Sequence, residues 1–139
     1  MEAANKAKHV VSISLGSSKR DAGAILELGG RKISIERRGT DGDLDRARQL
    51  LEQWDGKADA IGLGGTDLYV YAGKKRYTFR ESAHLIANVK KTPVLDGSGL
   101  KNSLERKLIK SLAVGSKVPI KGSKVLMVCG VDRFGMAEA

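Results

Sequence analysis

Short apolar runs that lead into glycine-rich loops are the feature that most constrains this chain. The runs over residues 9–15 and 58–63 have the length of strands, and each is followed directly by glycine. Between them, residues 44–54 repeat apolar side chains at the spacing of one helix face. Strands that alternate with helices predict βαβ crossovers and therefore a largely parallel sheet.

Two β-hairpins add antiparallel pieces to this sheet. The alternating runs 24–28 and 32–36 flank Gly29-Gly30, and the runs 68–72 and 75–79 flank Gly73-Lys74. The predicted fold class is therefore α/β, with a mixed, mostly parallel open sheet, flanking helices and two β-hairpins in a three-layer, Rossmann-like arrangement. Further helices are predicted over 80–91 and from Leu100 to Leu112, with strands over 94–95 and 124–129.

The chain of 139 residues predicts one domain and the opening of another. We expect a flexible leader over 1–8 and an α/β ligand-binding domain over 9–123. Residues 124–139 are predicted to form the strand and the first helical residues of a second, nucleotide-binding-like unit that is truncated. Cys129 ends the predicted strand and is expected in the core.

Composition excludes several classes of protein. The single cysteine cannot form an internal disulfide, no apolar run has the length of a membrane span, and the polar first residues lack the core of a signal peptide. His9 and His84 are far apart and have no cysteine near them, so no metal site is expected. These features predict a cytoplasmic protein without membrane contact.

Positive charge is concentrated in one segment. The formal charge is +9, and residues 101–124 hold seven basic side chains against Glu105 alone. This excess predicts an anionic partner, and we favour an acidic surface in a homodimer or in a missing second domain. Nucleic-acid binding is the less favoured alternative, because aromatic residues make up only 4% of the chain.

Glycine-rich loops follow most of the predicted strands. In an open parallel sheet, the loops at the carboxyl ends of the strands meet at one edge, where ligands bind. Glycine lets backbone N–H groups approach an anion, and Lys or Arg donate charge-assisted hydrogen bonds to it. The loop 16–21 combines these features best. The predicted ligand-binding residues are Gly16, Ser17, Ser18, Lys19, Arg20, Asp41, Gly64, Gly65, Asp67, Gly97, Ser98 and Asn102.

Two further groups of residues suggest chemistry. Asp96 and Lys101 flank a flexible loop and are the predicted catalytic pair for proton transfer on a hydroxyl or carbonyl substrate. The alternative is that Asp96 caps a helix and Lys101 is solvated. The segment GVDRFG lies between a predicted strand and a helix, which is the context of a dinucleotide site, although its spacing is GxxxxG. Its predicted cofactor-binding residues are Gly130, Asp132, Arg133 and Gly135.

The segments that carry these features resemble a known family. They are HVVSISLGSSKRD, RRGTDGDLDRA, DAIGLGGTDLYVYAGKKRY, KKTPVLDGSGLKNSLER and VLMVCGVDRFGMAEA. Together they resemble the N-terminal part of bacterial proteins catalogued as quinate or shikimate 5-dehydrogenase-like. The resemblance implies an α/β domain followed by a nucleotide-binding domain that begins near VLMV.

This resemblance implies NAD(P)-linked oxidation of a cyclic polyol acid. The substrate would be an anionic small molecule, and NAD or NADP would be the cofactor of the full-length protein. We expect no cofactor on these 139 residues and no turnover from them alone. One alternative is a non-catalytic α/β module that binds a phosphate-bearing metabolite, and another is a basic nucleic-acid-binding domain.

Overall fold

The computed structural model describes residues 7–115, 120 and 122–139, and within it the chain divides into two compact units. The first, called the sheet unit, holds the chain up to Asp67 together with Arg80–Asp96. The second, called the helical unit, holds Leu68–Phe79 and Gly97–Ala139. Most of the predicted leader 1–8 lies outside the described residues.

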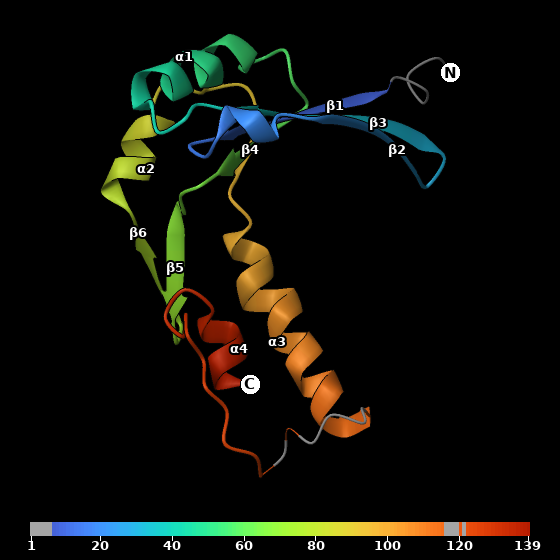
Figure 1. Cartoon of the computed structure of the whole chain (residues 1–139), viewed down its shortest axis with the longest axis vertical. Coiled ribbons are helices and arrows are strands. Elements are labelled where there is room, and N and C mark those ends of the chain that lie inside the picture. The colour runs from blue at the N-terminus through green and yellow to red at the C-terminus, as the bar shows by residue number, and fades with distance from the viewer. Residues whose placement is uncertain (1–6, 116–119, 121) are drawn as a thin grey trace. The chain divides into compact units, whose positions relative to one another are not determined.

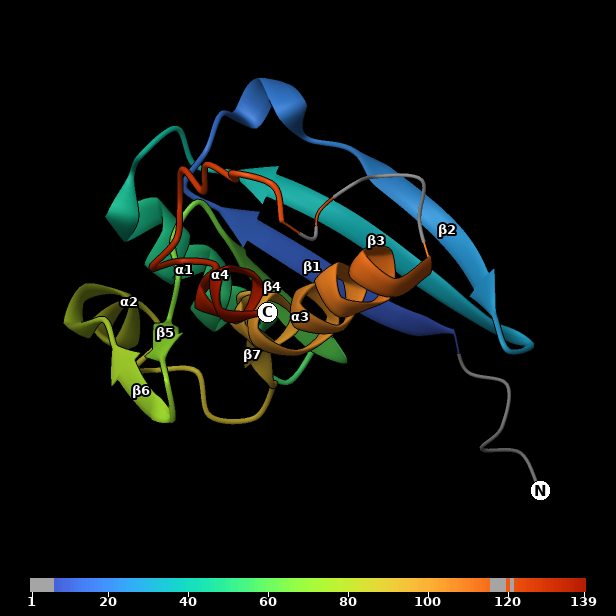
Figure 2. The ribbon, with the colours of Figure 1, turned by 90° about the horizontal axis from the view of Figure 1, so that it is seen from below.

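The sheet unit contains a five-stranded, mostly parallel sheet in the order β2-β3-β1-β4-β7. β2 pairs with β3 in the antiparallel sense, and the other neighbours pair in parallel. This confirms the predicted mixed, mostly parallel sheet (Figures 1 and 2). Its elements are β1 (Lys8–Ser14), the 3-10 helix η1 (Ser18–Arg20), β2 (Gly23–Leu28), β3 (Arg31–Gly39), α1 (Leu44–Trp54), β4 (Ala60–Gly64), α2 (Arg80–Leu85) and β7 (Val94–Leu95).

The helix α1 covers one face of this sheet (Figure 1). Side chains alternate between the two faces of a strand, so Val11 and Ile13 of β1 point to the same side. Both are fully buried, as are Ala47 and Leu51 of α1. The buried hydrophobic side chains of the described chain are Val11, Ile13, Ala47, Leu51, Ala58, Ile61, Leu63 and Leu85, and all of them belong to the sheet unit.

The predicted helix over 44–54 is confirmed as α1. Its first turn is capped by Asp43, whose carboxylate accepts a hydrogen bond from the backbone N–H of Arg46 at 2.9 Å. Gly56 follows the helix with a φ of +77°, a left-handed conformation that glycine adopts without strain.

The helix predicted over 80–91 is wrong in its second half, because α2 ends at Leu85. The carboxylate of Asp55 accepts the backbone N–H groups of Lys90, Lys91 and Thr92, at distances of 2.9, 2.8 and 2.8 Å. These N–H groups therefore bind a side chain instead of helical carbonyls, and the chain turns into β7. The same hydrogen bonds, led by the one from Lys90, hold the pKa of Asp55 below its ordinary value of 3.8.

The helical unit combines an antiparallel hairpin with two helices. These are β5 (Tyr69–Ala72), β6 (Lys75–Thr78), α3 (Ser98–Gly115) and α4 (Phe134–Glu138). The helices α3 and α4 approach closely at Gly135, where an added Cβ would stand 2.9 Å from Cα of Asn102 and 3.0 Å from the carbonyl oxygen of Lys101. Glycine at this position therefore permits the backbone contact between them.

The strand predicted over 124–129 is wrong. Residues 123–127 have no regular structure, and turns follow from residue 128 to residue 133. Val125, Leu126 and Val128 are 68%, 88% and 85% exposed, and Cys129, expected in the core, is also exposed. Apolar residues form a strand where another strand supplies hydrogen bonds, and no described strand pairs with this segment.

The division of the chain also differs from the prediction. We expected a boundary between residues 123 and 124, whereas Gly97–Ala139 lie in one compact unit together with the second hairpin. The reason is that α4, which follows the segment wrongly predicted as a strand over 124–129, packs on α3 and does not belong to a separate domain.

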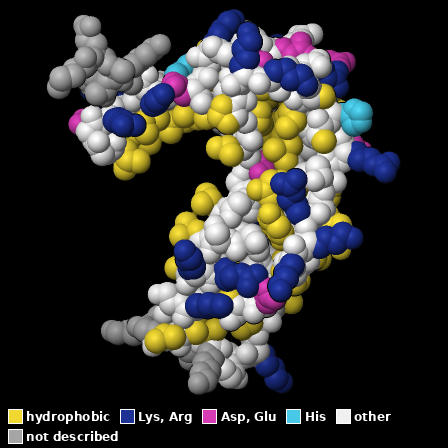
Figure 3. Space-filling model, turned by 180° about the vertical axis from the view of Figure 1, so that it is seen from behind, with side chains coloured by type: hydrophobic (Ala, Val, Ile, Leu, Met, Phe, Trp, Pro, Cys, Tyr) yellow, Lys and Arg dark blue, Asp and Glu magenta, His cyan; other side chains and the backbone are white. Residues whose placement is uncertain are grey.

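The predicted apolar face of α3 remains at the surface. Leu100, Leu104 and Leu108 are 59%, 59% and 53% exposed. Figure 3 shows such hydrophobic side chains at the surface among Lys and Arg side chains. Within the part of the chain that the structure describes, none of the helices has both the length and the apolar character needed to cross a membrane.

Candidate ligand-binding site

Three parallel strands of the sheet unit, β1, β3 and β4, end at the same edge. β1 lies between the other two, and the chain leaves β3, passes through α1 and returns as β4 on the far side of β1. Open α/β sheets bind ligands where the strand order reverses in this way. This edge brings together the predicted ligand-binding residues Gly16, Ser17, Ser18, Lys19, Arg20, Asp41, Gly64, Gly65 and Asp67.

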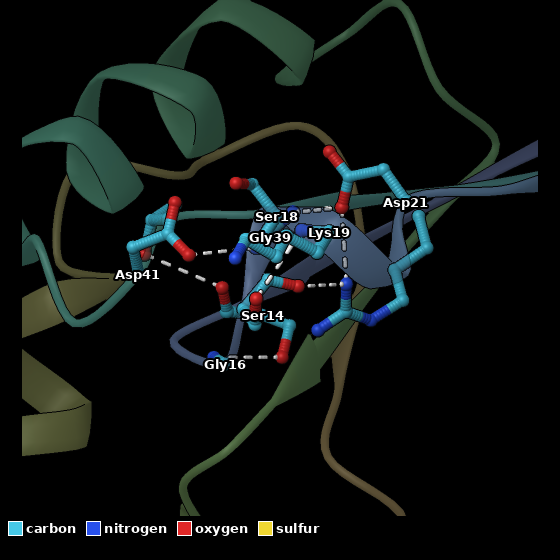
Figure 4. A network of polar contacts seen from close by, with 10 residues as sticks. Ser14, Gly16, Ser18, Lys19, Asp21, Gly39 and Asp41 are labelled. Atoms are coloured by element: carbon cyan, nitrogen blue, oxygen red, sulfur yellow. Dashed lines mark hydrogen bonds and ion pairs between the residues drawn. The ribbon is translucent and has the colours of Figure 1, made fainter.

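The loop 16–21 is closed by carboxylates of the chain itself (Figure 4). The backbone N–H of Ser18 donates to the carboxylate of Asp41 at 2.8 Å. The carboxylate of Asp21 accepts the N–H of Gly39 at 2.5 Å. The N–H of Ser18 is therefore already bound within the chain. What this loop offers to a ligand is chiefly its side chains.

Asp41 fixes the conformation of this loop through hydrogen bonds. Its φ of 53° is left-handed, a conformation that Asp tolerates better than most residues. Its N–H donates to the carbonyl of Gly16 at 3.1 Å, so both its backbone and its side chain fix the loop. Hydrogen bonds from the side chain and backbone of Ser18 hold the pKa of Asp41 below its ordinary 3.8.

A cavity of about 250 Å³ opens at the same edge of the sheet unit. Its wall comes from the residues that follow β1 and β4 and from the helices α1 and α2. This volume suits a small metabolite rather than a dinucleotide. The lining residues are Leu15, Leu44, Arg48, Thr66, Glu81, Ser82 and Leu85.

Polar groups converge on this cavity from two sides. The hydroxyl oxygens of Thr66 and Ser82 lie 2.7 Å apart and form one hydrogen bond. Ser82 is 3% exposed, so this pair is held in place by burial. Arg48 forms an ion pair of 2.9 Å with Asp45, while its side chain stays 42% exposed. The cavity therefore presents two hydroxyls, a guanidinium and the carboxylate of Glu81 beside three leucines.

Sequence reasoning missed the residues that line this cavity. Thr66 lies between predicted site residues in the GGTD segment and was passed over. Leu44 was assigned to the apolar face of the first helix, and Arg48 follows it at the i, i+4 spacing that places two side chains on one face. That spacing is the signal that could have found Arg48. Ser82 and Leu85 carry no comparable signal.

A second group of predicted residues meets in the helical unit. The ammonium of Lys101 forms an ion pair of 2.6 Å with the carboxylate of Asp132. The predicted partner Asp96 belongs to the sheet unit. Ser98, Lys101, Asn102, Asp132 and Gly135 share the lining of a cavity of about 10 Å³, which has room for one water and no organic ligand.

The residues predicted to bind a dinucleotide do not fit that role. Asp132 is paired with Lys101, and Arg133 is paired with Glu105, which raises the pKa of Arg133 above its ordinary value. Gly135 is packed against α3, so it does not stand open to a pyrophosphate. No described strand leads directly into this segment, and the strand–turn–helix context of such a site is therefore missing.

The basic segment 101–124 is partly neutralised within the chain. Lys101 pairs with Asp132, and Arg106 pairs with Glu138. The acidic surface that the sequence assigned to another chain or domain is thus partly supplied by the last residues of the helical unit. Lys117 and Lys121 lie outside the described residues.

Comparison with known protein families assigns the chain to a family but does not indicate an activity. The chain belongs to the family described as Domain of unknown function (DUF8753), which matches residues 9–96. A second family, described as Domain of unknown function (DUF8754), matches residues 99–139. The families change over between residues 96 and 99, and the last crossing between the two compact units falls at Asp96–Gly97. Neither the curated proteins nor the solved structures gave a match to this chain.

Proposed function

We propose that the sheet unit binds a small hydroxylated carboxylic acid in the cavity of about 250 Å³. The observation that carries this proposal is the mixed lining, which combines the guanidinium of Arg48 with the hydroxyl pair of Thr66 and Ser82. Binding sites for small molecules place a few polar groups in a largely apolar wall, and this cavity follows that pattern at the edge where α/β sheets bind ligands.

The chemistry of the lining favours a cyclic acid with several hydroxyl groups. A carboxylate pairs with the guanidinium of Arg48 through charge-assisted hydrogen bonds. Hydroxyl groups of the ligand donate to the Glu81 carboxylate and exchange hydrogen bonds with Ser82 and Thr66. The leucine side chains cover the C–H face of the ring. Quinate and shikimate have this combination of groups, in keeping with the resemblance noted from the sequence.

In this proposal the sheet unit is the substrate-binding domain of a quinate/shikimate dehydrogenase-like oxidoreductase. A three-layer, Rossmann-like arrangement and an NAD(P) cofactor in a longer protein belong to the same proposal. No step is assigned to the dinucleotide, because residues 130–135 do not fit it. Contact of the basic segment with a second copy or another domain also stays a proposal. Nucleic-acid binding is weakened by the pairing of Lys101 and Arg106.

Titration calorimetry with quinate and with shikimate tests the proposed function. We expect saturable binding, and we expect Arg48→Gln to weaken it by about tenfold to a hundredfold, because a charge-assisted hydrogen bond contributes about 1.5–3 kcal/mol. The matched control is Arg46→Gln, which removes the same charge from the same helix at an exposed position that does not line the cavity. This control should change the affinity by less than about twofold.

Two outcomes would overturn the proposal. One is the absence of saturable binding of either acid to the unmodified chain. The other is an equal loss of affinity in Arg46→Gln and Arg48→Gln, which would show that only the net charge of the helix attracts the acid.

A further inference from the structure

Two arginine side chains converge on one point beside Gly16, at the carboxyl end of β1. A Cβ added to Gly16 would stand 2.6 Å from Nη2 of Arg20 and 3.2 Å from Nη2 of Arg37. The hydroxyl of Ser14 lies 3.3 Å from the same point. Three hydrogen-bond donors thus surround a position that stays open because residue 16 has no side chain.

Arg37 is held in place by contacts on its other nitrogen. Its Nη1 donates to the carbonyl of Ser17 at 2.9 Å and to the carboxylate of Asp21 at 3.0 Å. The side chain is only 23% exposed, so little freedom remains to it. The other nitrogen, Nη2, faces Gly16.

Arg20 supplies the second guanidinium. It ends η1 and is exposed to solvent, and its guanidinium has no hydrogen-bond or ion-pair partner among the described residues. Two guanidinium groups that converge repel each other unless an anion lies between them. Asp21 already pairs with Nη1 of Arg37 and binds Gly39, while Asp41 binds Ser18, so Arg20 is the guanidinium that is left without a carboxylate.

Ser14 completes the set of donors. It is 6% exposed, and its oxygen accepts the N–H of Gly16 at 3.1 Å. The hydroxyl hydrogen is therefore left to donate to a third group. Gly64, on the neighbouring strand, would place a Cβ 3.1 Å from this oxygen, so a side chain there would crowd Ser14.

We propose that Arg20, Arg37 and Ser14 bind the phosphate group of a small metabolite. A phosphate monoester is an anion whose tetrahedral oxygens can accept from several directions, so it can bridge the Nη2 atoms of both guanidinium groups and the hydroxyl of Ser14. This site is separate from the cavity of the proposed function. Ser12 pairs with Arg37, and Ser14 follows it by two residues, so these side chains lie on the sheet face opposite the one covered by α1.

Titration calorimetry with inorganic phosphate at constant ionic strength tests this site. We expect saturable binding that weakens at least about tenfold in Arg20→Gln. The matched control is Arg31→Gln, which removes an equal charge from an exposed residue at the start of β3 and should change the affinity by less than about twofold. Acetate at the same ionic strength should compete poorly, because it carries a single charge and a planar group.

Gly16→Ala provides a second variant that keeps every charge. The φ of Gly16 lies outside the left-handed region, so alanine is compatible with the backbone. Its methyl group would occupy the point where the donors converge, and we expect phosphate binding to fall as far as in Arg20→Gln. Circular dichroism checks that each variant is folded.

Three results would overturn the site: no saturable binding of phosphate, equal losses in Arg20→Gln and Arg31→Gln, or unchanged binding in Gly16→Ala. Competition by acetate as strong as that by phosphate would refute the assignment to a phosphate group. Because the site shares no residue with the cavity of about 250 Å³, these results are independent of quinate or shikimate binding.

Discussion

The two units of this chain are held together by different interactions. In the sheet unit, α1 and the strands bury a continuous set of apolar side chains, including Val11 and Leu51 at full burial. In the helical unit, α3 meets the last residues through ion pairs such as Lys101–Asp132 and through the close packing of Gly135, while Leu100, Leu104 and Leu108 stay exposed. Burial of apolar surface stabilises strongly, whereas partly exposed ion pairs contribute little. The sheet unit should therefore be the more stable of the two.

The largest expected effect is on the core of the sheet unit. Leu51→Ala removes a fully buried side chain and should lower the free energy of unfolding by about 3 kcal/mol, because it leaves a cavity in the core. Urea denaturation followed by far-UV circular dichroism, which reports on the helices of both units, measures this loss. Leu108→Ala, at a position 53% exposed, is the control and should cost less than about 0.5 kcal/mol. Equal losses in the two variants would break the comparison between the units.

A smaller effect is expected where α4 meets α3. In Gly135→Ala the new Cβ would stand 2.9 Å from Cα of Asn102, so the backbones must separate, at a cost of about 1–3 kcal/mol. Faster hydrogen exchange of the α4 amides would report this separation. Gly130→Ala is the control, because its Cβ would lie at ordinary contact distances, 3.6 Å from Cγ and 4.0 Å from the carbonyl oxygen of Met127. Unchanged exchange in Gly135→Ala would show that the helices do not depend on this contact.

The smallest effect concerns pH. The pKa of Asp55 is lowered in the folded state, so its contribution to stability is fully present above the ordinary value of 3.8 and is lost as the pH falls through the lower, folded value. Asp41 acts in the same direction. Thermal unfolding across this range should show a decline in the unmodified chain that is shallower in Asp55→Asn. Identical pH profiles would indicate that Asp55 does not carry this dependence.

Much of the sheet unit followed from local pattern. The segment 44–54 forms a helix because its apolar spacing coincides with a real core and Asp43 caps it. The first hairpin formed where Gly29-Gly30 supplies two positive φ angles. The end of α2 could not be foreseen, because the competing acceptor, Asp55, is 35 residues away from Lys90 in the sequence. Long-range hydrogen bonds of this kind leave no periodic signal.

The arrangement of the strand ends was predicted in part. The loops that hold Gly16, Asp41 and Gly64 follow strands that end at one edge, whereas Gly97, Ser98 and Asn102 lie in the helical unit. The sequence could not show that Asp41 would take the N–H of Ser18. Nor could it show that Arg37, a strand residue, would point toward Gly16. The quinate/shikimate dehydrogenase resemblance and the cofactor remain predictions.

The second hairpin has a consequence for any attempt to divide this protein. Leu68–Phe79 is encoded within the stretch matched by the first family, yet it belongs to the helical unit. A fragment that begins at residue 99 would lack this hairpin, and a fragment that ends at residue 96 would carry it without the helices on which it packs. No single cut of the chain therefore releases both units whole.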